Sequence, residues 1–198
     1  VGSEMCIRDS GEIPALFTGE ADQRYLFFTD GQTQYLDKID DQSNGFFVTK
    51  WTNLTDNGQT ASNTADGGVN TDYPLFRLAD VYLMMAEAVV RGGTGSDRGT
   101  VLGYINELQR RAYGDDEHKI ADSDLTLDFL LKERARELYW EGHRRTDLIR
   151  YGMFTTDKYL WQWKGGEKGG TAVNSKYNIY PIPNTELTAN PNLYNENY

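Results

Sequence analysis

Three segments between residues 73 and 151 repeat apolar side chains at the three- and four-residue spacing of an amphipathic helix. The first helix is expected over residues 73–91, the second over 99–112, and the third from Thr126 to about Tyr151. A short glycine-rich stretch at 92–95 separates the first two, which predicts a helical hairpin. The sequence therefore indicates a mainly α fold in which helix pairs bury one face each.

Each expected helix has a start signal and an apolar face. Asp72 is the expected N-cap of the first helix, with Pro74 tolerated in its first turn, and Ser96 or Asp97 caps the second. The apolar positions expected on the buried faces are Leu75, Leu78, Tyr82, Met85 and Val89 in the first helix, Val101, Ile105, Leu108 and Ala112 in the second, and Leu127, Leu130, Leu131, Ala135 and Leu138 in the third.

Shorter, extended signals flank the helices. Residues 25–28 and 46–51 are rich in aromatic and β-branched side chains and lie next to Gly-containing turns, which predicts short strands. Residues 53–70 are polar and read as a long surface loop. The alternating residues 159–164, the glycines at 165–170 and residues 171–180 predict a β-hairpin. The prolines that follow favour an extended tail at 180–183.

Charge and composition exclude several classes of protein. With 20 basic and 30 acidic residues the chain has a net charge of −10, whereas a nucleic-acid-binding surface needs an excess of Lys and Arg. The longest apolar run, residues 81–86, is far shorter than the roughly 20 residues that cross a bilayer. The single cysteine, Cys6, excludes an internal disulfide framework and a zinc site built on several cysteines. His118 and His143 lack a second ligand at helical spacing, so no metal site and no cofactor are expected.

The sequence also suggests how the chain is divided. Residues 1–10 resemble a translated sequencing adapter and are set aside as an artefactual leader. Residues 11–72 form an extended, loop-rich segment, and residues 73–198 form the helical and C-terminal part of the same domain. At 198 residues a second domain is not expected.

Glu133, Glu137 and Glu141 lie four residues apart, on one stripe of the expected third helix. Their spacing of about 5–6 Å resembles the roughly 5–5.5 Å between the two carboxyls of a retaining glycosidase. Several arginines crowd the same helix, however, and arginine keeps a carboxylate ionised, whereas a general acid needs a raised pKa. We therefore interpret the stripe as an ion-pair lattice, and a glycosidase that uses Glu137 and Glu141 is the least favoured function.

Four aromatic residues are candidate ligand contacts. A strand over 159–164 would place Tyr159, Trp161 and Trp163 on one face, and flat aromatic rings with polar edges suit sugar rings. The alternative is that this stripe packs on the helical core. Trp51 borders the polar loop, where exposure to a ligand is expected.

Four ordered segments carry longer motifs. Residues 77–88 read RLADVYLMMAEA, residues 105–112 read INELQRRA, residues 133–150 read ERARELYWEGHRRTDLIR and residues 180–193 read YPIPNTELTANPNL. Together they resemble the SusD/RagB family of outer-membrane nutrient-binding lipoproteins, although Gln109 stands where that family usually has arginine. Weaker similarity lies in DQRY at 22–25 and TKW at 49–51.

The resemblance implies a SusD-like fold, with tetratricopeptide-like helix pairs that support an irregular, loop-rich part with short β-hairpins. It implies a protein of glycan utilisation and nutrient uptake that binds an oligosaccharide without cleaving it and delivers it to a SusC-like TonB-dependent transporter. It places the protein on the surface of the outer membrane, held by a lipid anchor that is expected to be missing from this chain. A peptide-binding member of the family is the alternative, and a helical-repeat scaffold for protein partners is another.

The resemblance also implies that the signature helix is scaffold. On this reading the ion-pair lattice holds the helices to the C-terminal tail, and Gly142 permits a close approach. Its expected members are Glu133, Arg136, Glu137, Glu141, Arg144 and Asp147.

Overall fold

The computed structural model describes residues 8–9, 11–17, 21–55, 57–61 and 69–195. The chain divides into two compact units, Val1–Arg144 and Arg145–Tyr198, which we name the N-terminal unit and the C-terminal unit. The boundary that the sequence suggested at residues 72–73 falls inside the N-terminal unit. Cys6 and most of the expected leader, residues 1–7 and 10, lie outside the described residues.

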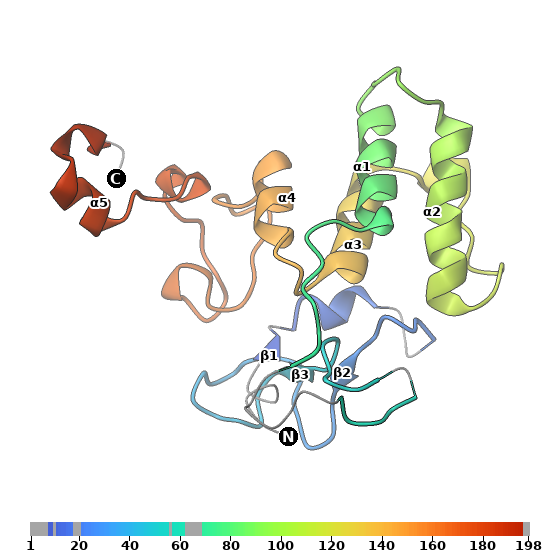
Figure 1. Ribbon diagram of the computed structural model, residues 1–198, viewed down its shortest axis with the longest axis horizontal. Helices are drawn as coiled ribbons and strands as arrows, with labels where there is room; N and C mark the ends of the chain where they lie inside the picture. The colour runs from blue at the N-terminus through green and yellow to red at the C-terminus, as the bar shows by residue number, and fades with distance from the viewer. Residues whose placement is uncertain (1–7, 10, 18–20, 56, 62–68, 196–198) are drawn as a thin grey trace. The chain divides into compact units, whose positions relative to one another are not determined.

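A three-stranded antiparallel sheet lies in the N-terminal unit (Figure 1). Its strands are β1 (Arg8–Asp9), β2 (Phe27–Phe28) and β3 (Phe46–Val48), in the order β1-β3-β2. β2 and β3 fall within the two runs for which the sequence predicted strands. β1 falls within residues 1–10, and it pairs with Phe46 and Phe47 of β3.

An aromatic cluster packs next to this sheet. Phe17, which follows the short 3-10 helix η2 (Pro14–Leu16), is buried with Val48 and Tyr139. The rings of Phe27 and Tyr139 stack with their centroids 5.2 Å apart, and Phe17 meets Tyr139 edge to face at 6.1 Å. The cluster therefore joins the sheet to the chain that follows the third helix.

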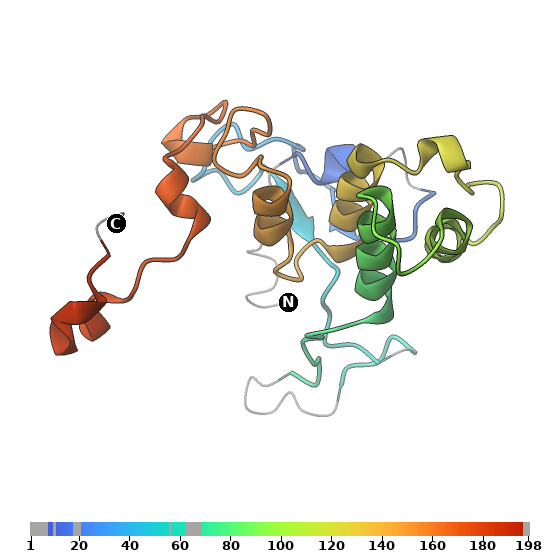
Figure 2. The same ribbon diagram turned by 90° about the horizontal axis from the view of Figure 1, so that it is seen from above.

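Helices α1 (Leu78–Val90) and α2 (Arg98–Tyr113) form the predicted hairpin, and the turn between them contains Gly92 with a φ of 95°. α3 (Leu127–Leu138) follows the 3-10 helix η3 (Asp122–Asp124) and packs on α1. Figures 1 and 2 show α1, α2 and α3 side by side. The buried core between them contains Ala79, Leu83, Ala86, Val101, Ile105, Leu108, Leu125, Leu130 and Leu138.

The predicted caps hold for α2 and α3 but not for α1. Asp97 accepts a hydrogen bond from the backbone N–H of Thr100, and Thr126 accepts one from that of Phe129. The prediction that α1 begins after Asp72 was wrong, since Arg77 is its N-cap residue, in an extended conformation. Residues 69–76 are not helical, so Pro74 lies before the helix.

The predicted apolar face of α1 was wrong at its first two positions. Leu75 and Leu78 are 72% and 61% exposed, whereas Ala79, Leu83 and Ala86 are buried. Tyr82, Met85 and Val89 pack partly buried against the same core. Near its start, α1 therefore buries Ala79 and Leu83 in place of the expected Leu75 and Leu78. Leu75 precedes the helix, so no helical turn places its side chain on the buried face.

The prediction of one long third helix to Tyr151 was wrong. α3 ends at Leu138, Tyr139 is extended, and Trp140 and Gly142 have φ values of 59° and 77° before α4 (Arg144–Arg150) begins. The extended backbone at Tyr139 lets its ring enter the aromatic cluster, where its hydroxyl donates to the backbone carbonyl of Arg24 at 2.8 Å. Glu141 consequently lies outside the helix that carries Glu133 and Glu137.

The C-terminal unit consists mostly of turns and short helices. Beyond α4 these are the 3-10 helices η4 (Lys164–Gly166), η5 (Ser175–Asn178) and η6 (Pro191–Leu193) and the helix α5 (Asn184–Ala189). The predicted β-hairpin over 159–180 is wrong. Trp163 and Gly165 have φ values of 66° and 67°, which turns the backbone where the first strand would have continued. Residues 181–183 are free of helix, as the prolines predicted.

Within the described residues, none of these helices has the length and apolar character needed to span a membrane.

Candidate functional site

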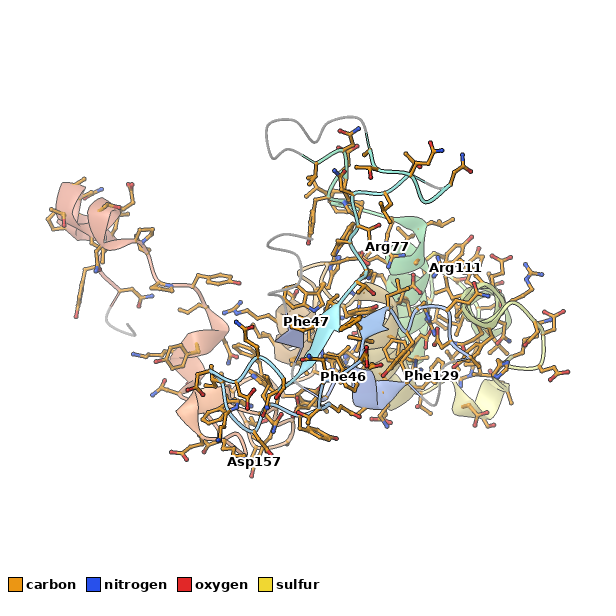
Figure 3. All side chains as sticks on the ribbon, turned by 90° about the horizontal axis from the view of Figure 1, so that it is seen from below. Phe46, Phe47, Arg77, Arg111, Phe129 and Asp157 are labelled. Carbon is orange, nitrogen blue, oxygen red and sulfur yellow. The ribbon has the colours of Figure 1, made fainter. Side chains whose placement is uncertain are left out.

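Glu137 is the centre of a buried ion-pair network in the N-terminal unit. It projects from the last turn of α3, and its side chain is 1% exposed. Its carboxylate accepts hydrogen bonds from Arg77 at 2.6 Å, from Arg111 at 2.5 Å to both oxygens, and from Arg24 at 3.2 Å. Figure 3 shows Arg77 and Arg111, which come from the start of α1 and from α2. Three separate segments therefore meet at one carboxylate.

Glu133 lies one turn earlier on α3 and is fully buried. One of its oxygens accepts from Arg24 at 2.5 Å, and the other accepts from Arg136 at 2.7 and 3.0 Å. Arg24 also donates to both oxygens of Asp22, which is 1% exposed. The guanidinium of Arg24 thus links the loop before β2 to two carboxylates of α3.

Glu141 reaches the same network from the irregular turn after α3. Arg77 donates to its two oxygens at 2.6 and 2.7 Å, and the ammonium of Lys50 donates to it at 2.5 Å. Lys50 also donates to the backbone carbonyls of Glu137 and Tyr139 at 3.0 and 2.9 Å. The turn is therefore tied both to the residue that caps α1 and to the chain just after β3.

The pairing controls the ionisation of both carboxylates. Burial acts to raise the pKa of Glu137, but the hydrogen bonds and positive charges of Arg111 and Arg77 outweigh it and lower that pKa to about 2. Burial likewise acts to raise the pKa of Glu141, and Arg77 and Lys50 lower it below its usual value. Both side chains are consequently carboxylates at neutral pH.

The partners of the acidic residues all lie within the N-terminal unit. Glu133, Glu137 and Glu141 pair with basic residues between 24 and 136. The expected link between this lattice and the C-terminal tail stays a prediction. Of the other expected lattice members, Arg144 donates to the carbonyl of Leu131 at 2.9 Å, and Asp147 pairs with Arg150 at 2.8 Å.

Trp51 lines a cleft next to this network. A cleft of about 390 Å³ is lined by Trp51, Lys50, Arg77, Arg111, Glu137 and Tyr139 among others, and we name it the Trp51 cleft. The indole N–H of Trp51 donates to the carbonyl of Trp140 at 3.3 Å, and its ring stacks on that of Tyr73 at 6.0 Å. The indole is half-buried, so part of it is held by these contacts while the rest borders the cleft.

The other three aromatic candidates lie in the C-terminal unit. Trp161 lines a second cavity, of about 610 Å³, together with Phe154, Tyr177 and Tyr180, and we name it the Trp161 cavity. Tyr159 contacts Trp161 with ring centroids 6.2 Å apart, but neither Tyr159 nor Trp163 lines the cavity. The three rings do not share a strand face, because residues 159–164 form turns.

Several residues of these sites were not predicted as site residues. The sequence did carry a signal for Arg77, Arg24 and Lys50. These residues lie in the family-like segments RLAD, DQRY and TKW, respectively. In the Trp161 cavity, Arg145 and Tyr180 also lie in family-like segments, at 133–150 and 180–193. Lys164 and Tyr177 carried no such signal, since turns bring them to the cavity. Among the described residues, no group of three or more His, Cys, Asp or Glu side chains could hold a metal ion.

The fold and its sites define a mainly helical protein with a helix hairpin in its N-terminal unit and an aromatic-lined cavity or cleft in each unit. The sequence profile of the SusD family matches residues 17–198, and the chain belongs to this family. The resemblance noted in the sequence is thereby confirmed.

Individual relatives agree with this assignment. The chain is 41% identical over 200 residues to the starch-binding protein SusD of Bacteroides thetaiotaomicron, across 100% of this chain and 33% of that protein. It is 34% identical over 122 residues to the SusD-like protein P25 of Formosa agariphila, across 60% of this chain and 22% of that protein. A SusD superfamily protein from Bacteroides vulgatus has a similar fold, with a TM-score of 0.58 at 24% identity, over 86% of this chain and 34% of that one. The chain thus spans about a third or less of the length of each of these proteins.

Proposed function

We propose that this chain is part of a cell-surface protein that binds an oligosaccharide without cleaving it and delivers it to a SusC-like TonB-dependent outer-membrane transporter. The observation that carries the proposal is the 41% identity, along the whole chain, to a protein named for starch binding. An α-linked glucan is accordingly the first ligand to test. A lipid anchor on the outer membrane and the transporter partner are parts of the same proposal.

The state of the acidic residues supports binding without catalysis. A glycosidase needs one carboxyl group with a raised pKa that can donate a proton. The pKa values of Glu137 and Glu141 are both lowered, and both groups are held by guanidinium groups. Glu141 also lies outside α3, the helix on which the two carboxyl groups were expected to be neighbours. The network therefore serves as scaffold, and no proton donor is available from this pair.

The geometry of the Trp51 cleft supports a role for Trp51 in holding the ligand. A partly exposed indole supplies a flat apolar surface for a sugar ring, and Arg111, whose side chain is 53% exposed, supplies N–H donors for hydroxyl groups at the same cleft. Trp161, with Tyr159 and Trp163 near it in sequence, remains the second proposed contact region.

Calorimetric titration of the chain with maltoheptaose tests this proposal. We expect binding that weakens at least tenfold in Trp51→Ala and is unchanged in Phe76→Ala, a control at an aromatic side chain that is 86% exposed and does not line the cleft. Circular dichroism should show that both variants fold. A parallel assay for reducing ends should detect no hydrolysis.

The same titration with a peptide panel separates the alternatives. Binding of peptides in place of maltoheptaose and other oligosaccharides would favour the peptide-binding branch of the family. Release of shorter sugars, abolished by Glu137→Gln, would establish an enzyme and overturn the proposal.

A further inference from the structure

The Trp161 cavity of the C-terminal unit has the walls of a small-molecule site. Its volume of about 610 Å³ lies within the range of roughly 300–1,000 Å³ that such sites occupy. Phe154 and Trp161 stack in its wall with centroids 5.9 Å apart, and Tyr177 and Tyr180 contribute two further rings. Tyr180 is 75% exposed, so one face of its ring is available to a flat ligand.

The charges at this cavity are all of one sign. Arg145 and Lys164 line it, and no Asp or Glu does. Lys164 is only 3% exposed, yet its ammonium donates to two neutral backbone carbonyls, those of Thr156 at 2.6 Å and Tyr159 at 2.8 Å. Within the described residues it forms no ion pair with a carboxylate. The ammonium also lies 4.7 Å from the centroid of the Trp161 ring, and burial lowers the pKa of Lys164 against the opposing effect of the nearby charge of Asp157. Burial of a cation with no carboxylate at ion-pair distance is costly, and an anion bound in the cavity would relieve that cost.

Arg145 is fixed in place before any ligand arrives. Its guanidinium donates to the carbonyl of Tyr177 at 2.6 Å and lies over the rings of Tyr180 at 3.9 Å and Phe154 at 5.1 Å. These contacts use one of its five N–H groups, and the described residues offer no partner for the others. A guanidinium held in this way is suited to a carboxylate, with which it forms two parallel hydrogen bonds.

One further feature favours an anionic sugar over an anion alone, and the charge balance of the unit favours an anion in general. The side-chain oxygen of Asn174 accepts from the backbone N–H of Lys176 at 2.9 Å, which leaves its amide N–H groups for ligand hydroxyls at the cavity wall. Residues 145–198 carry six basic and five acidic side chains, a net charge of +1, so residues 1–144 carry −11 and account for the chain's overall charge of −10. The positive cavity is thus not neutralised by the composition of its own unit.

We propose that the Trp161 cavity binds a carboxylate-bearing sugar, a uronic acid residue of an oligosaccharide, with the carboxylate on Arg145 and Lys164 and the ring on Tyr180. This site is separate from the Trp51 cleft and goes beyond the proposed binding of a neutral glucan. It would add selection for charge to a protein whose relatives include a starch binder.

Titration of the chain with trigalacturonate tests the proposal, and its methyl ester, which keeps the rings but removes the charges, is the matched ligand control. We expect trigalacturonate to bind at least tenfold more tightly than the ester. Arg145→Gln should weaken trigalacturonate binding at least tenfold, whereas Lys158→Met, at an exposed lysine that does not line the cavity, should leave it unchanged.

Lys164→Met and Tyr180→Ala extend the test. Lys164 is buried, so Lys164→Met is the variant at risk of not folding. Tyr180→Ala changes an exposed ring and keeps the test decisive if Lys164→Met does not fold. Equal binding of the acid and its ester, or unchanged binding in both Arg145→Gln and Tyr180→Ala, would overturn the proposal. Tight binding of trialanine, lost on its amidation and on Arg145→Gln, would assign the cavity to peptide carboxylates and overturn the sugar assignment.

The outcome is independent of the glucan proposal. Trp51→Ala should leave trigalacturonate binding intact. Arg145→Gln keeps the Trp161 ring that is proposed as a second glucan contact, so it should leave maltoheptaose binding intact. Loss of both ligands in either of these two variants, correctly folded, would contradict the separation of the two sites.

Discussion

At the scale of single residues, Glu137 is the carboxylate on which most of the buried network depends. Removing its charge leaves Arg24, Arg77 and Arg111 without a shared partner in a site where Glu137 itself is 1% exposed. Breaking a buried pair by removing one partner costs about 3–5 kcal/mol. We expect Glu137→Gln to lower the free energy of unfolding by about 3 kcal/mol, measured by urea denaturation.

A surface pair provides the control for this substitution. Lys132 and Asp128 pair at 2.7 Å, but their side chains are 50% and 71% exposed. Exposed pairs contribute about 0–1 kcal/mol, so Asp128→Asn should change the free energy of unfolding by less than about 1 kcal/mol. Equal effects of the two substitutions would show that the network contributes no more than a surface pair.

The lowered pKa of Glu137 also predicts how stability depends on pH. The pKa is about 2 in the folded chain, against an ordinary value of 4.5. Ionised Glu137 therefore stabilises the fold fully above about pH 5, and this contribution is lost as the pH falls through 4.5 towards 2. The difference corresponds to about 3 kcal/mol.

Urea denaturation at several pH values checks this dependence. Between pH 6 and pH 2 the unsubstituted chain should lose about 3 kcal/mol more than Glu137→Gln, because the other carboxylates titrate in both proteins. Parallel curves for the two proteins would contradict the assigned role of Glu137.

Gln109 offers the opposite case, a buried polar group whose removal should stabilise. It is 4% exposed, and its side-chain nitrogen has no hydrogen-bond partner among the described residues. An unsatisfied buried donor costs about 1–3 kcal/mol, so Gln109→Met, of similar shape, should raise the free energy of unfolding by about 1 kcal/mol.

Asn106 on the same helix is the control for Gln109. Its amide both donates to and accepts from the backbone of Ile120, at 3.2 and 2.8 Å. Asn106→Leu should therefore destabilise by about 1–3 kcal/mol in the same denaturation experiment. A loss of stability in Gln109→Met as well would mean that Gln109 is satisfied in solution.

At the scale of elements, the turn between α3 and α4 decides where Glu141 lies. Gly142 has a φ of 77°, and a Cβ built on it would lie 3.1 Å from the hydroxyl of Tyr73. Gly142→Ala should lower the free energy of unfolding by about 1–2 kcal/mol, because an L-residue is strained in this conformation.

Gly103 in the middle of α2 provides the matched comparison. A Cβ there would meet nothing within 4 Å, and the position is exposed. Gly103→Ala should stabilise the chain by about 0.5–1 kcal/mol through helix propensity. A thermal melt of both variants should thus show shifts of opposite sign, and shifts of the same sign would contradict this account of the turn.

The same turn shows what the sequence could and could not predict. Local signals predicted α2 closely, since Asp97 caps it and its four expected apolar residues are buried. The end of α3 was missed because long-range contacts set it: Tyr139 packs against Phe17 and Phe27, more than 100 residues away. The helical periodicity of the sequence ELYWEGHRR, residues 137–145, continues through residues 139–143. In the structure, tertiary packing holds these residues outside a helix.

The candidate sites show a similar division. The sequence indicated that the glutamates pair with arginines, but it drew the arginines from the same helix, whereas Arg77 and Arg111 come from α1 and α2. The pattern of alternating aromatics at 159–164 predicted a strand, yet the backbone forms turns there, with positive φ at Trp163 and Gly165. Spacing along the chain specifies which residues share an element, but not which elements meet.

At the scale of the whole molecule, burial is distributed unevenly between the two units. The N-terminal unit contains both the helical core and the aromatic cluster. Among the described residues 145–195 only Asp147, Leu148 and Lys164 are buried. Because local stability follows the amount of buried apolar contact, the two units should open with different free energies.

Hydrogen exchange followed by mass spectrometry tests this difference. Amides of α1, α2 and α3 should exchange only through global unfolding, and their protection should fall with urea. Amides of residues 151–195, whose backbone bonds lie in exposed turns, should exchange at least about tenfold faster and with little dependence on urea. Uniform protection along the chain would show that the C-terminal unit shares the stability of the helical core.

The exchange experiment also reports on the Trp161 cavity. With uniform protection the cavity would be as rigid as the network around Glu137. The expected difference in protection means instead that a ligand bound in the cavity also orders the cavity walls. Addition of trigalacturonate should then slow exchange around Trp161 and Tyr180 without changing the protection of α2.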